Sequence, residues 1–316
     1  MILKKNKPIL IVAGEPKSIF FEILFKSLKN NKFISPIILI GSNNLLQSEM
    51  KKFKYKKQIR LISFENLKKF KFNNNSINLI NVNFDKRKVN IYIKDCFDLA
   101  FKILRSEFTY KFINGPVNKY SFLNKKYLGI TEYIAQKFNV KKSAMLIYNN
   151  NLSVCPVTTH LPLKLVSKSI TSELIKEKTI LINDFFKINF GFRPNIAVTG
   201  LNPHCETILK FSEDNEIITP TVKRLKKNGY KIYGPFPADT VFLKQNRKKF
   251  DVIMGMYHDQ VLAPIKTLKE YDAINITLGL PFYRISPDHG PNKKMINKNL
   301  SSSLSLLKAI KFLDQR

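Results

Sequence analysis

Short apolar runs that end at turn residues recur along the chain and predict strands buried on both faces. The first, Pro8–Ala13, ends at a Gly-Glu-Pro turn, and a second, Pro36–Ile40, ends at Gly-Ser-Asn. Apolar runs of about four to eight residues between turn signals are typical of such strands. Similar runs predict further strands at Lys111–Ile113, Asn195–Thr199, Asp251–Met256 and Ile274–Leu278.

Other segments carry helical or hairpin patterns. Apolar side chains recur at helical spacing in Ser18–Leu28, and we expect helices also over Asp95–Phe108 and Leu163–Phe186. Ala144–Tyr148 and Leu152–Val157 flank three consecutive asparagines, which predicts an antiparallel hairpin.

Repeated strand-then-helix units predict an α/β fold with a largely parallel sheet. In such folds ligands sit beyond the carboxyl ends of the strands, so we expect a site in the turns that follow them. The segment Asn66–Asn90 is rich in Lys and Asn, which predicts a loop-rich surface. The 316 residues suffice for one large or two medium domains.

The net charge is the most unusual feature of the composition. The chain carries 54 Lys and Arg against 23 Asp and Glu, a formal charge of +31. This excess would suit a nucleic-acid partner, but only eight of the basic residues are arginine, the side chain that suits bidentate phosphate contacts. We therefore interpret the charge as a residue bias spread over the surface, with no specific nucleic-acid partner. A diffuse positive field still attracts small anionic substrates.

Composition also excludes several classes of protein. Apolar residues make up 44% and charged residues 24%, as in ordinary globular chains. No apolar run approaches the roughly 20 residues of a membrane span, and Pro8–Ala13 is too short for the apolar part of a signal peptide. The cysteines Cys96, Cys155 and Cys205 form no CxxC pair and suit a reducing cytoplasm, where we expect the protein.

Three of the four histidines, His160, His204 and His258, closely follow predicted strands. Imidazole is a common ligand of borderline metal ions, so the three predict a metal or catalytic cluster. The alternative is three separate loop histidines, because their spacing is long-range and no HExxH pair is present. Asp239 and Asp259 are candidates to orient ligand imidazoles, or are ordinary surface carboxylates.

Common phosphate and nucleophile motifs are absent from the sequence. There is no GxxxxGK[ST], no GxGxxG after the first predicted strand and no GxSxG. These absences count against a P-loop nucleotidase and against serine hydrolase chemistry.

Several longer blocks occur in a fixed order. They are Thr158–Leu163, Gly200–His204, Gly234–Thr240, Met256–Gln260, Asn275–Phe282 and Ser286–Gly290. Together they closely resemble the 4-hydroxythreonine-4-phosphate dehydrogenase (PdxA) family of vitamin B6 biosynthesis. The resemblance runs from about Gly14 to about Pro291.

The resemblance implies a fold of the isocitrate/isopropylmalate dehydrogenase type, with two α/β subdomains around a central active-site cleft. One subdomain would span residues 1–125 plus about 285–316, and the other residues 126–284, with the dimer interface. The family works as a homodimer whose active sites draw on both subunits. Its members are not membrane proteins, and they take a small phosphorylated anion as substrate.

Roles for individual residues also follow from the resemblance. The family's divalent metal, which we expect to be zinc, magnesium or cobalt, is held by histidines that match His160, His204 and His258. The family's substrate contacts match Thr131, Lys266, Asn275 and Arg284, and the family aspartate near the metal matches Asp239. The segment Asp288-His289-Gly290 would face the nicotinamide cofactor, NAD or NADP.

The implied reaction oxidises 4-phosphohydroxy-L-threonine at its secondary alcohol by hydride transfer to NAD⁺. The β-keto acid product loses CO₂ to give 3-amino-2-oxopropyl phosphate. A metal ion suits this chemistry as a Lewis acid on the alcohol oxygen, and Lys266 and Arg284 suit an anionic substrate. Asp239, Asp259 and Lys266 are all candidates to accept the alcohol proton.

Some residues depart from the family pattern. The family's Gly-His-Thr-Glu block, whose histidine touches substrate, reads Gly129-Ile130-Thr131-Glu132. The loops after Gly14, His204 and Gly290 also differ from the family pattern. Alternatives are therefore a paralogous dehydrogenase of another four-carbon hydroxy-acid phosphate, such as threonate or erythronate 4-phosphate, or a non-enzymatic basic binding protein on the same scaffold.

Overall fold

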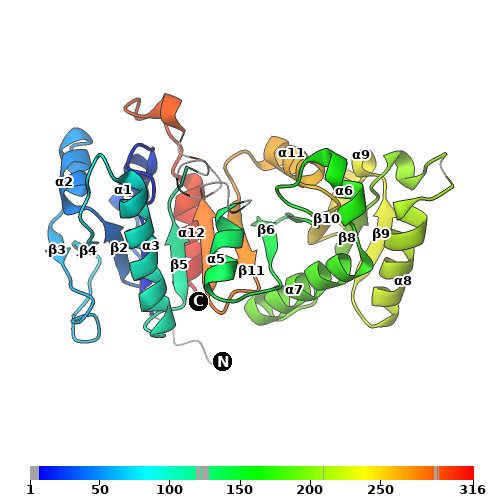
Figure 1. The fold of residues 1–316 in the computed structure, drawn as a ribbon, viewed down its shortest axis with the longest axis horizontal. Helices are drawn as coiled ribbons and strands as arrows, with labels where there is room; N and C mark the ends of the chain where they lie inside the picture. The colour runs from blue at the N-terminus through cyan, green and yellow to red at the C-terminus, as the bar shows by residue number, and fades with distance from the viewer. Residues whose placement is uncertain are drawn as a thin grey trace. The chain divides into compact units, whose positions relative to one another are not determined.

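The computed structural model describes residues 7–118, 122, 127, 129–208, 210–287, 290 and 292–316. The chain divides into two compact units (Figure 1). The first comprises Met1–Ile130 and Pro281–Arg316, and the second comprises Thr131–Leu280. Each unit is described by itself below.

The first unit is built on six strands in the order β3-β4-β2-β1-β5-β12. The pairs within this order are all parallel. Ile11 at the centre lies opposite Leu39 on one side and Ile113 on the other. The strands are β1 (Ile9–Val12), β2 (Ile37–Gly41), β3 (Ile59–Leu61), β4 (Ile77–Asn81), β5 (Lys111–Asn114) and β12 (Tyr283–Pro287).

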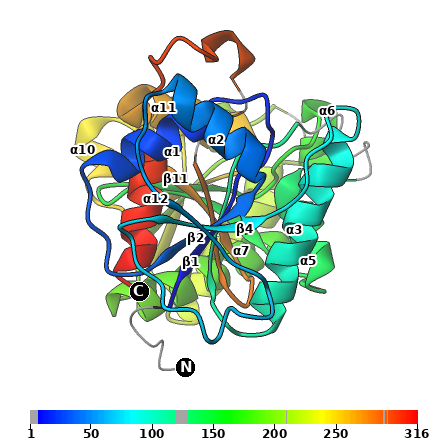
Figure 2. The ribbon, with the colours of Figure 1, turned by 90° about the vertical axis from the view of Figure 1, so that its left-hand side faces the viewer.

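Helices cover both faces of these strands. Figure 2 shows α1 and α12 on one side and α3 on the other. The Glu22 carboxylate of α1 accepts a hydrogen bond from the Ser301 N–H at 2.7 Å, just before α12 begins. The helical elements are α1 (Phe20–Lys29), α2 (Asn43–Lys52), α3 (Val89–Arg105), a short 3-10 turn (Lys293–Met295) and α12 (Leu304–Asp314).

The second unit is built on six strands in the order β11-β6-β7-β10-β8-β9. β6 runs antiparallel to β11 and β7, whereas β7, β10, β8 and β9 are parallel to one another. The strands are β6 (Ala144–Tyr148), β7 (Ser153–Pro156), β8 (Ile196–Thr199), β9 (Ile232–Phe236), β10 (Val252–Gly255) and β11 (Ile274–Leu278).

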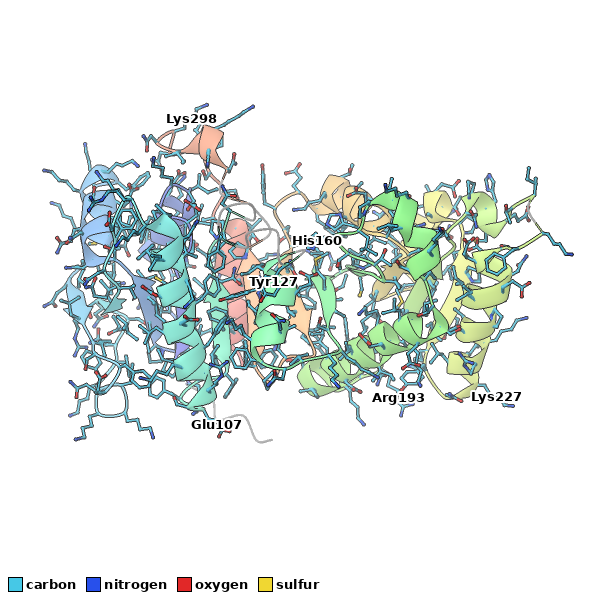
Figure 3. All side chains as sticks on the ribbon, viewed as in Figure 1. Glu107, Tyr127, His160, Arg193, Lys227 and Lys298 are labelled. Carbon is cyan, nitrogen blue, oxygen red and sulfur yellow. The ribbon has the colours of Figure 1, made fainter. Side chains whose placement is uncertain are left out.

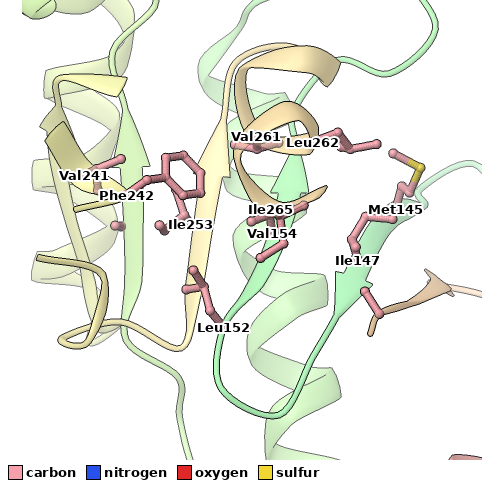
Figure 4. Close-up of a cluster of buried hydrophobic side chains, with 12 residues drawn as sticks. Met145, Ile147, Leu152, Val154, Val241, Phe242, Ile253, Val261, Leu262 and Ile265 are labelled. Carbon is pink, nitrogen blue, oxygen red and sulfur yellow. The ribbon is translucent and has the colours of Figure 1, made fainter. Parts of the chain in front are cut away.

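A buried apolar cluster fixes α11 against these strands (Figure 4). Val261 and Ile265 of α11 pack in it with Val154 of β7 and Ile253 of β10. The helical elements are α5 (Ile130–Lys137), α6 (Leu163–Ser169), α7 (Ser172–Phe190), the turns Pro203–Cys205 and Asp214–Ile218, α8 (Thr219–Lys227), α9 (Ala238–Val241), α10 (Lys244–Arg247) and α11 (His258–Lys269).

The predicted α/β class is confirmed, and each predicted strand and the hairpin are present. Two predictions are wrong in detail. The segment Asn66–Asn90 contains the buried strand β4 and the start of α3. The single helix predicted over Leu163–Phe186 is two helices, because Thr171 interrupts it and caps α7 by accepting the Leu174 N–H at 3.2 Å.

Two further expectations concern the spread of basic residues over the surface and the cellular compartment of the protein. Basic side chains such as Arg193, Lys227 and Lys298 point outward from different elements (Figure 3). In the part of the chain that the structure describes, no helix is long and apolar enough to cross a membrane. The three cysteines are free thiols.

Candidate functional site at three strand ends

Three histidines follow the carboxyl ends of neighbouring strands in the second unit. His160 follows β7, His258 follows β10 and His204 follows β8. These strands are adjacent in the order β7-β10-β8 and run parallel. The loops after them therefore leave the same edge of the sheet, which is where α/β folds bind ligands.

Two of these histidines, His160 and His258, lie side by side. Their ring centroids are 5.8 Å apart with an interplanar angle of 39°. His258 is the first residue of α11, and its Nδ1 lies 2.7 Å from the Asp259 carboxylate. That contact leaves Nε2 of His258 to face a ligand. The Asp259 side chain is exposed, and its described hydrogen-bond partner is this imidazole.

Glu132 of α5 lies beside the His160 ring (His160 is labelled in Figure 3). Its Oε1 lies 3.6 Å from His160 Nδ1, too long for a hydrogen bond but within ion-pair range. Thr159 Oγ1 donates to the same oxygen at 3.3 Å. His160 Nδ1 and Glu132 Oε2 are both buried and have no hydrogen-bond partner among the described residues.

The Glu132 carboxyl is ionised more readily than an isolated one. Burial would raise its pKa, but the His160 imidazole, a backbone N–H and the Thr159 hydroxyl together lower it below its usual value. A charged carboxylate beside an imidazole fixes the ring's orientation and raises its basicity. The sequence pattern gave no sign of this role for Glu132.

His204 lies on a tight turn beside a pocket. His204 and Cys205 both adopt left-handed backbone angles, with φ of 55° and 63°, which cost energy for residues other than glycine. The pocket has a volume of about 360 Å³. Its lining comprises Leu201, Asn202, Pro203, His204, Ala238, Asp239, Tyr257 and Gln260.

The turn that carries His204 is anchored by the fully buried Asp214. The Asp214 carboxylate accepts hydrogen bonds from the backbone N–H groups of Leu201 at 2.7 Å and Asn202 at 3.1 Å. It also accepts one from Asn202 Nδ2 at 2.9 Å. Three hydrogen bonds to one buried carboxylate fix the residues at the start of the turn, because bonds to a charged acceptor are strong.

The residues present suit a divalent metal ion in part. His160 and His258 present neighbouring imidazoles, each with Nδ1 facing a carboxylate and Nε2 remaining for a metal. Among the described residues, however, no three His, Cys, Asp or Glu side chains stand together as a ready metal site. The structure thus brings two of the predicted ligands together, and the three-histidine site stays a prediction.

Other predicted residues occupy varied settings. Thr131 is buried in α5, and Lys266 is half-buried two turns along α11 from His258. Asn275 of β11 has a buried Oδ1 with no partner among the described residues, an arrangement that suits a polar ligand. Asp239 is exposed on α9 beside His204.

The remaining predictions fall in the first unit. Arg284 of β12 is fully buried, and its Nε donates to Asn114 Oδ1 at 2.8 Å. The substrate role of Arg284 stays a prediction. Asp288 and His289 lie outside the described residues, and Gly290 is exposed.

Comparison with known proteins gives a consistent result. Residues 32–313 match the family model described as pyridoxal phosphate biosynthetic protein PdxA. The chain is 35% identical to the 4-hydroxythreonine-4-phosphate dehydrogenase of Sulfurihydrogenibium sp. (strain YO3AOP1), over 95% of each chain. It is 33% identical to the protein of the same name from Wigglesworthia glossinidia brevipalpis, over 98% of this chain and 96% of the relative.

Solved structures agree with these relatives. The crystal structure of 4-hydroxythreonine-4-phosphate dehydrogenase from Klebsiella pneumoniae superposes with a TM-score of 0.81 at 27% identity, covering 97% of this chain and 98% of that one. The enzyme of the same name from Burkholderia phymatum gives a TM-score of 0.77 at 26% identity, covering 98% of both chains.

Proposed function

Because the chain belongs to the PdxA family of pyridoxal phosphate biosynthetic proteins, we propose that it oxidises 4-hydroxythreonine 4-phosphate with NAD⁺ or NADP⁺. The hydride leaves the carbon that bears the secondary alcohol, and the β-keto acid then loses CO₂ to give 3-amino-2-oxopropyl phosphate. The observation that carries the proposal is the pairing of His160 with His258 at adjacent strand ends.

His160, His204 and His258 are the residues that would hold a divalent ion such as Zn²⁺, Mg²⁺ or Co²⁺. Such an ion supplies a Lewis acid that lowers the pKa of an alcohol oxygen. The carboxylates of Glu132 and Asp259 keep the His160 and His258 rings oriented for this task. Neutral imidazole ligands leave the positive charge of the ion available to the substrate.

Four further side chains of the second unit are assigned roles in the reaction. Asn275 offers a buried carbonyl oxygen that can accept a hydrogen bond from the substrate. Lys266 offers a cation for a phosphate or carboxylate, and Thr131 a hydroxyl. Asp239 lines the pocket beside His204 and is the best candidate to accept the alcohol proton, because the Asp259 carboxylate is already engaged by His258.

A second candidate function rests on Ile130. Ile130 is the first residue of α5 and occupies the position of the family histidine that touches substrate. An isoleucine side chain cannot form the hydrogen bond of the family histidine, so one substrate contact of the family is missing. The alternative substrate is therefore a different four-carbon hydroxy-acid phosphate. Initial rates of NAD⁺ reduction with 4-hydroxythreonine 4-phosphate, threonate 4-phosphate and erythronate 4-phosphate separate the two. A higher kcat/KM for threonate 4-phosphate or erythronate 4-phosphate than for 4-hydroxythreonine 4-phosphate would favour the alternative substrate.

The assembly and cofactor complete the proposal. We infer a homodimer whose subunits share each active site, located in the cytoplasm, with the segment around Gly290 facing the nicotinamide. Sedimentation equilibrium measures the oligomeric state, and a monomer that retains full activity would contradict a shared site. Rates with NAD⁺ and NADP⁺ at equal concentration identify the preferred cofactor.

A further inference from the structure

The side chain of Gln260 connects two of the histidine-bearing loops. Gln260 lies in the first turn of α11 and is 9% exposed. Its Oε1 accepts hydrogen bonds from the Met256 N–H at 2.7 Å and from Thr199 Oγ1 at 2.8 Å. Its Nε2 donates to the Gly200 carbonyl oxygen at 2.8 Å. One amide thus connects the end of β10, before His258, to the end of β8, before His204.

The chemistry of the partners fixes which way the amide points. A backbone N–H can only donate and a backbone carbonyl can only accept, so Oε1 must face Met256 and Nε2 must face Gly200. The Thr199 hydroxyl is fully buried and donates to the same Oε1, which has a second lone pair to accept it. The Gln260 amide therefore accepts two hydrogen bonds and donates one. No other residue type of this size could satisfy these three partners together.

The glycines at both strand ends leave room for this network. A Cβ on Gly255 would lie 3.0 Å from Gln260 Oε1 and 2.4 Å from a methyl carbon of Val261. A Cβ on Gly200 would lie 2.7 Å from both Asp214 Oδ1 and Cys205 Sγ. Larger residues at either position would push α11 or the His204 turn away from the strands.

The third loop joins through Met256. Thr158 Oγ1 donates to the Met256 carbonyl oxygen at 2.7 Å, and the Thr158 N–H donates to the same oxygen at 3.1 Å. Thr158 lies two residues before His160. A continuous set of hydrogen bonds therefore links the loops of His160, His258 and His204. The Gln260 side chain bonds to both the His258 loop and the His204 loop.

We propose that Gln260 is a positioning residue that sets the spacing between the His204 and His258 loops. It acts on the backbone of both loops and touches neither imidazole in the described hydrogen bonds. The inference rests on the proposed function in taking His204 and His258 as metal ligands. Its structural part, the coupling of the two loops, can be measured without any metal.

Amide hydrogen exchange of the metal-free protein tests this coupling. In Gln260→Met the amides of Met256, Leu201, Asn202, His204 and Cys205 should exchange about tenfold faster or more, because the buried bonds that tie the two loops together are lost. Gln260→Glu keeps the acceptor for Met256 and replaces the donor to Gly200 with a second oxygen that faces the Gly200 carbonyl. The amides of Leu201, Asn202, His204 and Cys205 should therefore exchange faster, and the Met256 amide should change less than in Gln260→Met. The matched control, Thr267→Val, removes a bond from Thr267 Oγ1 to Ala263 within the same helix and should change neither loop.

Zn²⁺ titration then tests the functional part. Zn²⁺ affinity should fall about tenfold in Gln260→Met and stay unchanged in Thr267→Val, a scale typical of residues that orient metal ligands. The proposal would be overturned if the amides of both loops in Gln260→Met exchanged at the wild-type rate. It would also be overturned if they exchanged faster while the Zn²⁺ affinity stayed undiminished. Absence of Zn²⁺ binding in the wild-type protein would instead contradict the proposed metal site, and the exchange experiment alone would then decide the role of Gln260.

Discussion

Arg284 Nε donates a hydrogen bond to Asn114 Oδ1 at 2.8 Å, and neither side chain is more than 2% exposed. The contact joins neighbouring strands, β12 and β5, in the first unit. Asn114 also donates from Nδ2 to the Gly115 carbonyl at 2.9 Å, which holds its amide in the orientation that Arg284 needs. A buried guanidinium depends on such acceptors, because an uncompensated buried charge is costly.

Replacing Asn114 with Ala should therefore lower the free energy of unfolding by about 2–3 kcal/mol, the scale of a bond to a charged group. Urea unfolding measures this loss. The control is Asn83→Ala, at an exposed position of the same unit, which should change stability by less than about 0.5 kcal/mol. Equal stability of the two variants would show that Asn114 is not needed by Arg284.

Lys111 gives a prediction about pH. Its side chain is buried in β5, where Nζ donates to Ser35 Oγ at 2.9 Å. Burial lowers the pKa of Lys111, with the Asp314 carboxylate opposing the effect. At pH values between the lowered pKa and the usual value of about 10.4, the unfolded chain binds more protons than the folded one. The free energy of unfolding therefore rises with pH in this window.

The variant Lys111→Met lacks this titration. The stability of the wild type relative to Lys111→Met should therefore rise as pH increases from about 7 to about 10. Chemical unfolding at several pH values measures the gap. Lys51→Met, at an exposed position, serves as the control and should show no such trend. A gap that is constant with pH would contradict the assigned shift.

Asp214 is predicted to hold the strained turn that carries His204. Asparagine at this position would turn an NH₂ group toward backbone donors and leave at least one of them unpaired. Asp214→Asn should cost about 1.5–3 kcal/mol in the free energy of unfolding. Thermal unfolding compares it with Asp184→Asn on the exposed face of α7. A melting temperature no lower than that of the control would exclude the anchoring role.

Glu132 is predicted to support His160. Glu132→Gln preserves the shape of the side chain but removes its charge, so the imidazole loses the partner that orients it. Divalent metal affinity should fall about 10–100-fold, with little change in melting temperature. Glu173→Gln, at an exposed position of α7, is the control. Undiminished affinity in Glu132→Gln would show that the carboxylate serves the fold alone.

The fold was predictable wherever apolar residues form uninterrupted runs. The strands β1 and β2 needed no other signal, because runs such as Ile9–Val12 are fully buried. β4 was missed because its residues lie within a Lys- and Asn-rich segment. Its Asn78 is buried and donates from Nδ2 to the carbonyls of Asn73 and of the distant Ile37, and such a partner cannot be read from composition.

The site was predictable only in part for a related reason. Strand-end placement predicted that His160, His204 and His258 lie at one edge of the sheet, because parallel strands bring their carboxyl ends together there. Their role as metal ligands stays a prediction. The contact of Glu132 with His160 depends on the packing of α5 beside the loop after β7. Such packing produces no pattern in the local sequence around Glu132. Asp214 and Gln260 likewise act through buried bonds to backbone groups far away in the chain.

The most direct test of the proposed function is NAD⁺ reduction by the metal-loaded protein with 4-hydroxythreonine 4-phosphate as substrate. Wild-type protein should produce NADH, and His258→Ala should lose about 100-fold or more in kcat, because a Lewis acid supplies several kcal/mol of stabilisation to the transition state. Absence of NADH formation by the wild type, or equal rates in the wild type and His258→Ala, would contradict the account.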